Sequence, residues 1–282
     1  MASAIATAPT DSAPLLRAPH QRAKGEGRVA VVSRDGVTRL ADLYQQGCCK
    51  IRLPDRRGKG QEAVLINSSG GMTDDDDLRW SMRAGTGSDL TISTQACERV
   101  YRSNGNPAQL NTHLTVEAGA RLDWLPQETI LFDGGRLNRE LTIDLEDDGE
   151  ALIVEPLLFG RMAMHELMVD GSLRDRWTVR RNGKLVHREA IDLDSDVEKT
   201  LSSAMIAGEA RAAATVLFLS PNAEALHEAA GRHAATRLGV ALFDDRIVIR
   251  CLGRDGYDLR NALLPVLHTL RDGRALPKVW NT

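Results

Sequence analysis

Cysteine is scarce in this chain and gives no sign of a disulfide framework. The 282 residues include four cysteines, Cys48, Cys49, Cys97 and Cys251, and none of them forms a C-x-x-C pair. Two of them are adjacent in the sequence, a geometry that disfavours a bridge between them. This usage fits a reducing compartment, so we expect a cytoplasmic protein.

Long apolar runs and an excess of positive charge are also missing. No segment approaches the roughly 18 apolar residues that a bilayer-spanning helix needs. The chain has 36 Lys and Arg against 39 Asp and Glu, and its net charge of −3 provides no field that would collect nucleic acid or an anionic membrane. We expect neither of these as a partner.

The start of the chain lacks the features of a secretory signal. Residues 1–20 have no charged n-region and no continuous apolar core. Their Ala, Ser and Pro content predicts a disordered lead-in, which we place at residues 1–27. The remainder, residues 28–282, is expected to form a single domain.

The signatures of nucleotide-binding proteins and of common hydrolases are absent as well. There is no G-x-x-x-x-G-K-[ST] loop, and GTGSDL lacks the third glycine of a dinucleotide-binding loop. NSSGG has neither the G-x-S-x-G spacing nor the following helix of a serine hydrolase. The seven histidines form no H-x-x-x-H or H-E-x-x-H pair, so a tight zinc site is not predicted.

What the sequence does contain, from residue 28 to about 195, is alternation of apolar and polar residues with a period of two, which predicts β-strands. Gly87, Gly119 and Gly149 are 32 and 30 residues apart, and each lies between two alternating runs. The apolar positions of this repeat are Leu78, Trp80, Met82, Leu90 and Ile92; Leu110, Leu114, Val116, Leu122 and Trp124; Leu141, Ile143, Leu145, Leu152 and Val154. The recurrence predicts stacked β-sheet units or a β-helix-like scaffold with a shared core.

Beyond residue 195 the composition becomes richer in alanine, and residues 196–282 are expected to be mixed. Asn222 is a plausible N-cap for a helix whose apolar residues recur with 3.6-residue spacing up to residue 234. A short hairpin should follow over residues 239–253. A second helix is expected at about residues 257–271, kinked by Pro265. The fold class is therefore mainly β with two C-terminal α-helices.

Carboxylates are the most informative candidates for chemistry. Asp74 to Asp77 follow two glycines, where a flexible loop could present oxygen ligands to a divalent cation, although a solvated acidic turn is the favoured alternative. Glu155 lies in an otherwise apolar run, so its burial would require a partner, for which Arg161 is a candidate. Structural pairing of Glu155 is favoured over metal binding. His165 and His187 could be ligands at the ends of a path for a metal ion, but lone histidines on strands are more often hydrogen-bonded structural residues.

The stretch LDWLPQETILFDGGRLNR, residues 122–139, combines a proline, a double glycine and several charged groups. Glu128 and Asp133 flank an expected strand that contains Pro126, so this strand should lie at a sheet edge or carry a bulge. We interpret the stretch as a structural corner in which Glu128 and Asp133 are candidate lining groups.

Six segments carry a resemblance to a known family. In chain order they are LYQQG, LINSSGGMTDDDDL, STQACERVYRS, LDWLPQETILFDGGRLNR, FGRMAMHE and GYDLRNALLPVLHTLRDGRALPKVW. Together they resemble the urease accessory protein family UreD, also called UreH, over residues 28–282. The family commonly has GG-x-T-x-G-D where this chain reads GGMTDDDD. Asp76 matches the acid of that motif, and Asp75 replaces its glycine.

The resemblance implies a non-catalytic maturation factor with no tightly bound cofactor. It would bind the urease apoprotein and recruit the accessory protein UreF and, through it, the GTPase UreG, so that nickel reaches the urease active site. Nickel would then be held only in transit, by weak oxygen and imidazole ligands. The candidate ligands are Asp76, Glu155 and His187.

Two further expectations concern partners and rival functions. Leu263, Leu264, Leu267 and Leu270 supply more apolar surface than one short helix needs, which favours partner contact by residues 222–282; packing on the β layers is the alternative. A metal-dependent hydrolase is the rival function, and it would use four carboxylates. These are Asp76, Glu128, Asp133 and Glu155. A free-standing β-repeat binding module is the third interpretation.

Overall fold

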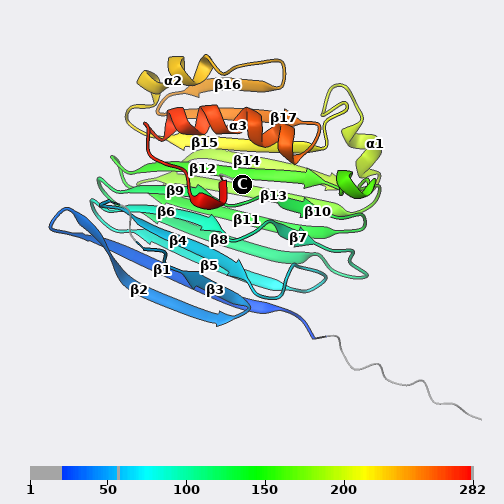
Figure 1. Cartoon of the computed structure of the whole chain (residues 1–282), viewed down its shortest axis with the longest axis horizontal. Helices are drawn as coiled ribbons and strands as arrows, with labels where there is room; N and C mark the ends of the chain where they lie inside the picture. Colours follow the sequence, from blue (N-terminus) through cyan, green and yellow to red (C-terminus); the bar gives the residue numbers. More distant parts are fainter. Residues whose placement is uncertain (1–20, 56–57, 281–282) are drawn as a thin grey trace, which may run out of the picture.

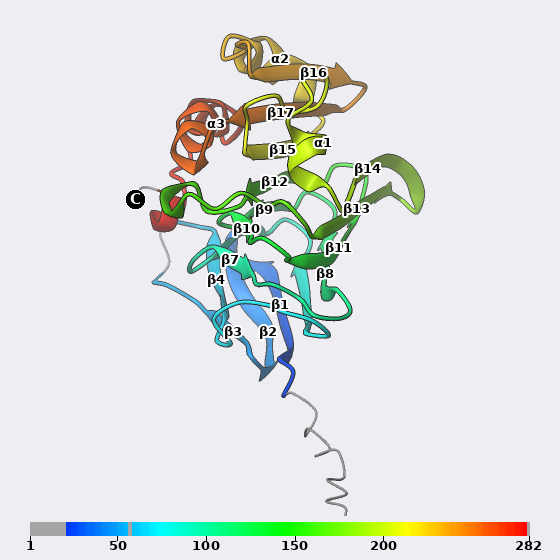
Figure 2. The same cartoon turned by 90° about the vertical axis from the view of Figure 1, so that its right-hand side faces the viewer.

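The computed structural model describes residues 21–55 and 58–280, which form two large β-sheets packed face to face (Figures 1 and 2). Sheet A has seven strands in the spatial order β14 (Lys184–Asp194), β13 (Ser172–Arg181), β11 (Arg136–Leu145), β8 (Ala108–Val116), β5 (Asp77–Ala84), β1 (Lys24–Arg34) and β2 (Val37–Gly47). Sheet B runs in the order β16 (Leu238–Phe243), β17 (Arg246–Gly253), β15 (Ala212–Leu219), β12 (Glu150–Phe159), β9 (Arg121–Leu125), β6 (Asp89–Thr94), β4 (Gln61–Asn67) and β3 (Cys49–Arg52). Two short strands, β7 (Glu98–Val100) and β10 (Thr129–Leu131), extend sheet B beside β12.

The chain winds between the two sheets as a solenoid. It passes from β5 in sheet A to β6 in sheet B, returns to β8, and repeats this course through β9, β11 and β12. Equivalent strands of successive coils pair in parallel, while the outermost strands pair antiparallel. The predicted β-helix-like scaffold is therefore confirmed.

The glycine repeat holds for two coils and shifts by one residue in the third. Leu90 of β6 lies opposite Leu122 of β9, as the predicted spacing requires. In β12, however, Ala151 takes the position opposite Leu122, and the predicted Leu152 points the other way. Because neighbouring side chains of a strand face opposite sides, this one-residue slip moves Leu152 out of the first core and into the second.

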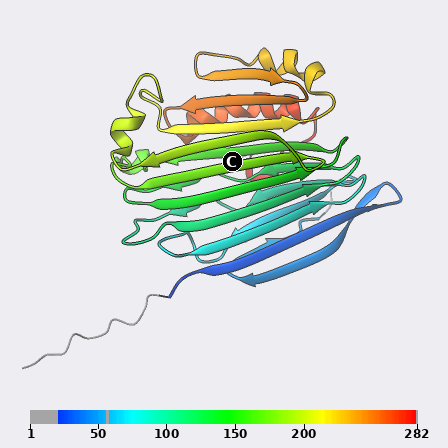
Figure 3. The same ribbon diagram turned by 180° about the vertical axis from the view of Figure 1, so that it is seen from behind.

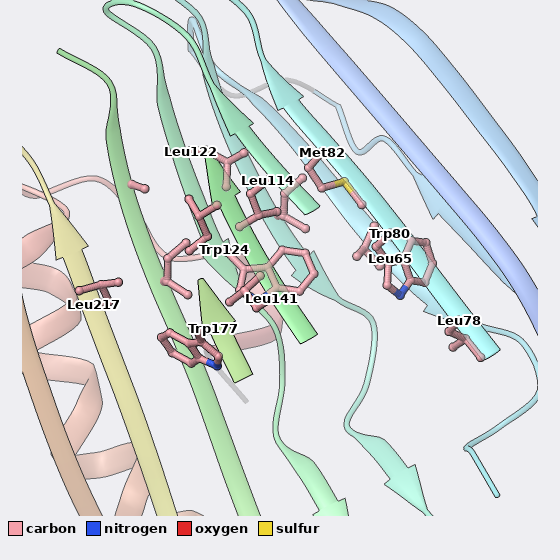
Figure 4. Close-up of a cluster of buried hydrophobic side chains, with 14 of the residues drawn as sticks. Leu65, Leu78, Trp80, Met82, Leu114, Leu122, Trp124, Leu141, Trp177 and Leu217 are labelled. Atoms are coloured by element: carbon pink, nitrogen blue, oxygen red, sulfur yellow. The ribbon is translucent and has the colours of Figure 1, made fainter. Parts of the chain in front are cut away.

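The first core fills the space between the sheets with large apolar side chains from every coil. Figure 4 shows ten of them labelled along the solenoid: Leu65, Leu78, Trp80, Met82, Leu114, Leu122, Trp124, Leu141, Trp177 and Leu217. All belong to one contiguous buried cluster. At about 25 cal/mol per Å² of apolar area removed from water, such a cluster is the main source of the stability of the coil stack.

Two helices near the C-terminus pack on the outer face of sheet B, over β15, β16 and β17. Helices α2 (Ala223–Gly231) and α3 (Gly256–Leu270) confirm the two predicted helices, and a hairpin of β16 and β17 lies between them in the sequence. Asn222 occupies the N-cap of α2 but makes no capping bond with its side chain, whereas Asp255 caps α3 by accepting from Asp258 N at 2.8 Å. The remaining helices are α1 (Val197–Leu201) and the 3-10 turns η1 (Met162–Met164) and η2 (Lys278–Trp280).

The leucines of α3 face the sheet. Leu263, Leu267 and Leu270 are fully buried in the second core, which also contains outward-facing residues of β12 and β15, and Leu264 packs at its margin. The apolar surface that suggested a partner site is thus buried within the chain, which agrees with the alternative of packing on the β layers. Partner contact by the C-terminal segment stays a prediction, and it would require side chains other than these three.

Strand β1 begins at Lys24, so the β-region starts four residues before the predicted boundary at residue 28. Residues 1–20 of the predicted lead-in lie outside the described residues. Of the helices that the structure describes, none has the length and apolar character needed to cross a membrane.

Candidate functional site

The two ends of the solenoid differ in construction. At one end the coils close through short turns at residues 85–88, 117–120 and 146–149. At the other end they close through four long loops, residues 68–76, 95–107, 126–135 and 160–171, and we call this end the corner end. The segments SSGGMTDDD, QACERVYRS, PQETILFDGG and GRMAMHE all fall on these loops, so residues far apart in the sequence form one surface.

Backbone hydrogen bonds join the four loops into a continuous ladder. Met72 N donates to Arg99 O at 2.7 Å, and Phe132 N donates to Val100 O at 3.0 Å. Gly160 N then donates to Leu131 O at 2.8 Å, which ties the last loop to the third. Each loop therefore depends on its neighbours for its conformation.

Pro126 lies in the third loop, after β9 ends and before β10 begins. The expected strand that contains Pro126 was wrong, because the chain turns the corner at the proline. The interpretation of residues 122–139 as a structural corner is confirmed by this geometry.

The first loop is held by its acidic residues. Asp76 accepts from two backbone groups, Ala23 N at 2.7 Å and Thr73 N at 2.8 Å, and its side chain is buried. Asp74 is also buried and forms an ion pair with Arg22 at 2.9 Å. The favoured interpretation of a solvated acidic turn was therefore wrong for these two carboxylates, which fasten the start of β1 to the loop.

The departure from the family motif at Asp75 leaves the turn intact. Asp75 adopts a left-handed conformation with φ of 60°, a region that glycine enters most easily but that aspartate tolerates better than most residues. Gly71, with φ of 148°, is more restrictive, because an added Cβ would lie 2.7 Å from Arg99 O. Gly71 is thus required for close contact between successive loops, whereas Gly70 has open space around it and is favoured only by its positive φ of 80°.

Glu128 connects the third loop to the C-terminal segment. Arg260 of α3 donates to both Glu128 carboxylate oxygens, at 2.7 and 2.9 Å, and to Gln127 Oε1 at 2.7 Å. The same guanidinium lies 5.2 Å from the ring centroid of Trp280, whose Nε1 donates to Leu125 O at 2.9 Å. Glu128 therefore anchors α3 and, through Arg260, the C-terminal tail at residues 277–280.

Asp133, near the end of the same loop, also has a structural role. Its Oδ1 accepts from Val169 N at 2.9 Å and from Asp170 N at 3.0 Å, and Arg102 forms an ion pair with its other oxygen. These bonds hold the fourth loop against the third. Asp133 is thus satisfied by backbone donors and one arginine.

Arg161 does not reach Glu155, and the predicted pair between them was wrong. Its guanidinium forms an ion pair with Glu166 and stacks over the ring of Phe132, 4.3 Å from the centroid. Arg161 belongs to the exposed end of the corner loop, whereas Glu155 points into the interior from β12.

The partner of Glu155 is Arg139, which reaches across from the other sheet. Arg139 bridges Glu155 and Asp175, and Trp124 Nε1 donates to Glu155 Oε1 at 2.7 Å. All of these side chains are buried. Burial raises the pKa of the Glu155 carboxyl, and the Arg139 guanidinium opposes this shift. Structural pairing of Glu155 is therefore present, with one guanidinium facing two carboxylates.

A small cavity of about 40 Å³ lies beside this cluster, between the sheets. Several of its lining groups are polar: Thr94, Glu98, Thr112, Gln127, Thr129, Arg139 and Glu155. A space of this size can hold water, and its polar groups offer the partners that a buried water needs. The cavity is therefore a polar interior site and not an apolar void.

Glu98 lies where this cavity meets a second one of about 140 Å³, because Leu65, Trp80, Thr94 and Glu98 line both. Gly70 and Gly71 of the first corner loop also line the second cavity. Burial raises the pKa of Glu98 to about 7, although Asn67 Nδ2 donates to its carboxylate at 3.0 Å. The sequence analysis missed Glu98; its place in the matched segment STQACERVYRS was the available signal.

The three candidate nickel ligands are not gathered into one site. Asp76 lies in the first corner loop, Glu155 lies inside the solenoid, and His187 lies on the edge strand β14, with Nε2 3.8 Å from Glu189 Oε2. Within residues 21–55 and 58–280, no three His, Cys, Asp or Glu side chains are grouped so that they could hold a metal ion. Nickel binding by any of the three stays a prediction.

The corner end is also where apolar side chains remain exposed. Eight of the twelve large apolar side chains that the described chain leaves exposed lie on or beside it: Tyr101, Met162, Met164, Leu167, Val169, Met205, Ile206 and Tyr257. A cleft of about 750 Å³, lined in part by Met162, Met164 and Leu158, opens among them. Concentration of exposed apolar surface at one end is typical of a protein-binding site.

The fold and the corner end define a β-solenoid protein with an exposed apolar end. The model of the family described as UreD urease accessory protein matches residues 23–281. Proteins named urease accessory protein UreD are 45% identical in Agrobacterium fabrum (strain C58 / ATCC 33970), over 93% of this chain and 92% of that protein, and 46% identical in Chelativorans sp. (strain BNC1), over 98% and 99%. The chain therefore belongs to the UreD urease accessory protein family.

Proposed function

We propose that this protein is a non-catalytic scaffold of urease maturation that binds the urease apoprotein and recruits UreF and, through it, the GTPase UreG. Family membership over nearly the whole chain supports a role in urease maturation. The observation that favours a scaffold is the corner end, where eight large apolar side chains are exposed and take no part in the packing of the two cores.

The rival hydrolase finds little support in the geometry. Asp76 and Asp133 accept backbone hydrogen bonds, Glu128 is held by Arg260, and Glu155 is held by Arg139. Four carboxylates engaged at separate places cannot act together on one or two metal ions.

Nickel would pass this scaffold as cargo. Glu155 is the candidate ligand whose surroundings best suit transit, because it lines a polar cavity. It also shares the single Arg139 guanidinium with Asp175, so one of the two carboxylate charges has no cation of its own in this cluster. A single carboxylate among oxygen ligands holds nickel weakly, which allows release to urease.

Deletion of the gene in a urease-positive host tests the proposal. Urease should still be made, but it should be poor in nickel and inactive, and purification of the tagged protein should recover the urease apoprotein together with UreF and UreG. Reintroduction of the intact chain serves as the control. Normal urease activity in the deletion strain without added nickel would contradict the proposed function.

A further inference from the structure

The outer face of sheet A is open. In Figure 3, sheet A faces the viewer and no described helix crosses it, whereas the outer face of sheet B carries α3. Strands β5, β8, β11 and β13 of sheet A alternate between buried, mostly apolar residues that point inward and polar residues that point outward. This face therefore consists of a broad polar surface on a rigid support.

Arginine is concentrated on this open face. The outward side chains of β5, β8, β11 and β13 include six arginines but only three carboxylates, although the whole chain carries a net charge of −3. Two of these arginines, Arg79 and Arg83, lie on β5, one, Arg136, lies on β11, and three, Arg174, Arg176 and Arg180, lie on β13. The positive charge of the face thus opposes the net charge of the molecule.

These arginines can be reached by a partner. Arg79 pairs with Asp77 at 2.7 Å, but its side chain remains 63% exposed. Exposed pairs of this kind contribute at most about 1 kcal/mol, so an incoming carboxylate can replace the internal one. Arg174 of β13 and Arg188, which lies on the adjacent strand β14 opposite Thr178, are exposed and form no ion pair within the part of the chain that the structure describes.

The size of the face suits a stable protein contact. Seven strands at about 4.8 Å spacing, each roughly 30 Å long, present on the order of 900 Å², against about 800 Å² per partner in a standard interface. The outward positions of β5, β8, β11, β13 and β14 include no aromatic residue on which bases could stack, and the ring of Tyr44 on β2 lies beneath the Arg28 guanidinium, 4.4 Å from the ring centroid. Glu140 and Asp144 in the middle of the face would also repel a continuous phosphate backbone.

We propose that the open face of sheet A is a docking surface for a flat, net-acidic face of a folded partner protein. The choice of partner for the test rests on the proposed function, which supplies the urease apoprotein. Complementary charge steers association and makes it sensitive to salt, so this contact differs in kind from the apolar corner end. A scaffold with two such surfaces can hold two partners at once.

Charge reversal at Arg174 and Arg188 tests the inference, because neither arginine has an ion-pair partner in the described chain that would be left behind. The Arg174→Glu and Arg188→Glu double variant should bind immobilised urease apoprotein about tenfold more weakly at low salt, with a smaller dependence on sodium chloride. The matched control reverses Arg232 and Arg237, which are exposed near α2, and makes the same change in net charge. Its affinity should stay within about twofold of the unaltered chain.

Three outcomes separate the possibilities. Equal affinity and equal salt dependence of the double variant, while the unaltered chain binds, would overturn the docking surface and leave the proposed function standing. No binding of the apoprotein by the unaltered chain would contradict the proposed function itself. Tight binding of duplex DNA that the double variant loses would overturn the choice of a protein partner. A thermal melt of each variant, with Arg174→Gln and Arg188→Gln as a milder version, shows whether a loss reflects misfolding.

Discussion

Arg260 and Glu128 lie 132 residues apart in the sequence, yet the Arg260 guanidinium donates to both oxygens of the Glu128 carboxylate. The pair joins the C-terminal helix to the corner that follows β9, and it places Arg260 over the ring of Trp280. The PQE corner and the PKVW tail are therefore two halves of one contact, which explains why both belong to the segments that resemble the family.

Arg260→Ala should destabilise the protein by about 3 kcal/mol, because it leaves the buried Glu128 carboxylate without its cation. Equilibrium unfolding in urea measures the loss. Arg232→Ala removes an arginine from an exposed pair with Glu228 and should cost less than about 0.5 kcal/mol. Equal effects of the two changes would contradict the buried contact.

Asp76→Ala should also lower the free energy of unfolding, by about 2 kcal/mol, because two backbone N–H groups lose their acceptor. Asp76→Asn keeps one acceptor oxygen and should lose about half as much. Asp75→Asn is the matched control, since Asp75 is exposed and asparagine tolerates its left-handed conformation. An unchanged melt of the alanine variant would show that Asp76 does not fasten the loop.

The two backbone hydrogen bonds change the interpretation of Asp76, the acid of the family motif. From the sequence, Asp76 was a candidate nickel ligand in an acidic loop; in the structure a backbone N–H donates to each of its two carboxylate oxygens. The loop sequence alone did not indicate this, because one of the two donors, Ala23, lies 53 residues away.

Sequence periodicity predicted the solenoid because each strand keeps one face buried, and the alternation records that face. It did not predict Arg139 as the partner of Glu155, although Arg139 occupies an inward position in the same alternating run as Leu141 and Ile143. Proximity in the sequence favoured Arg161 instead. Contacts across the interior depend on the register between sheets, and the one-residue shift at β12 is not encoded in the glycine spacing.

Glu98 should make stability depend on pH near neutrality. Its pKa of about 7 in the folded chain lies above the ordinary value of 4.5, so the folded state holds the proton more tightly than the unfolded state. This contribution to stability is fully present below pH 4.5 and is lost as pH rises through about 7. Glu98→Gln should therefore stabilise the protein by about 1 to 2 kcal/mol near pH 8, allowing for partial solvent screening, and by little near pH 5.

Unfolding in urea at both pH values measures the difference. Glu140→Gln, on the open face of sheet A, is the control and should show no comparable change between them. A Glu98 variant whose effect is the same at both pH values would contradict the raised pKa.

Met164→Glu should leave the fold unchanged and weaken partner binding. The Met164 side chain is 67% exposed, so the change should alter stability by less than about 0.5 kcal/mol. Placing a charge in an apolar contact should reduce affinity for the recruited accessory protein by about tenfold or more. Phe243→Glu, also at an exposed apolar residue but on the β16–β17 hairpin, is the matched control and should bind normally. Equal binding by both variants would remove the corner end as the partner site.

Glu155→Gln tests whether the interior cavity takes part in nickel delivery. Glutamine has nearly the same shape and can still accept from Trp124 Nε1, and Arg139 keeps its pair with Asp175. The variant should therefore change the free energy of unfolding by less than about 2 kcal/mol. It removes a negative charge from the cavity, however, and with it the candidate ligand for a passing cation. Urease matured with this variant should contain less nickel than urease matured with Glu224→Gln, which removes an exposed carboxylate from α2. Full nickel loading together with an unchanged melt would show that Glu155 has only its structural pairing, and a reduced load with an unchanged melt would place the carboxylate on the path of the metal.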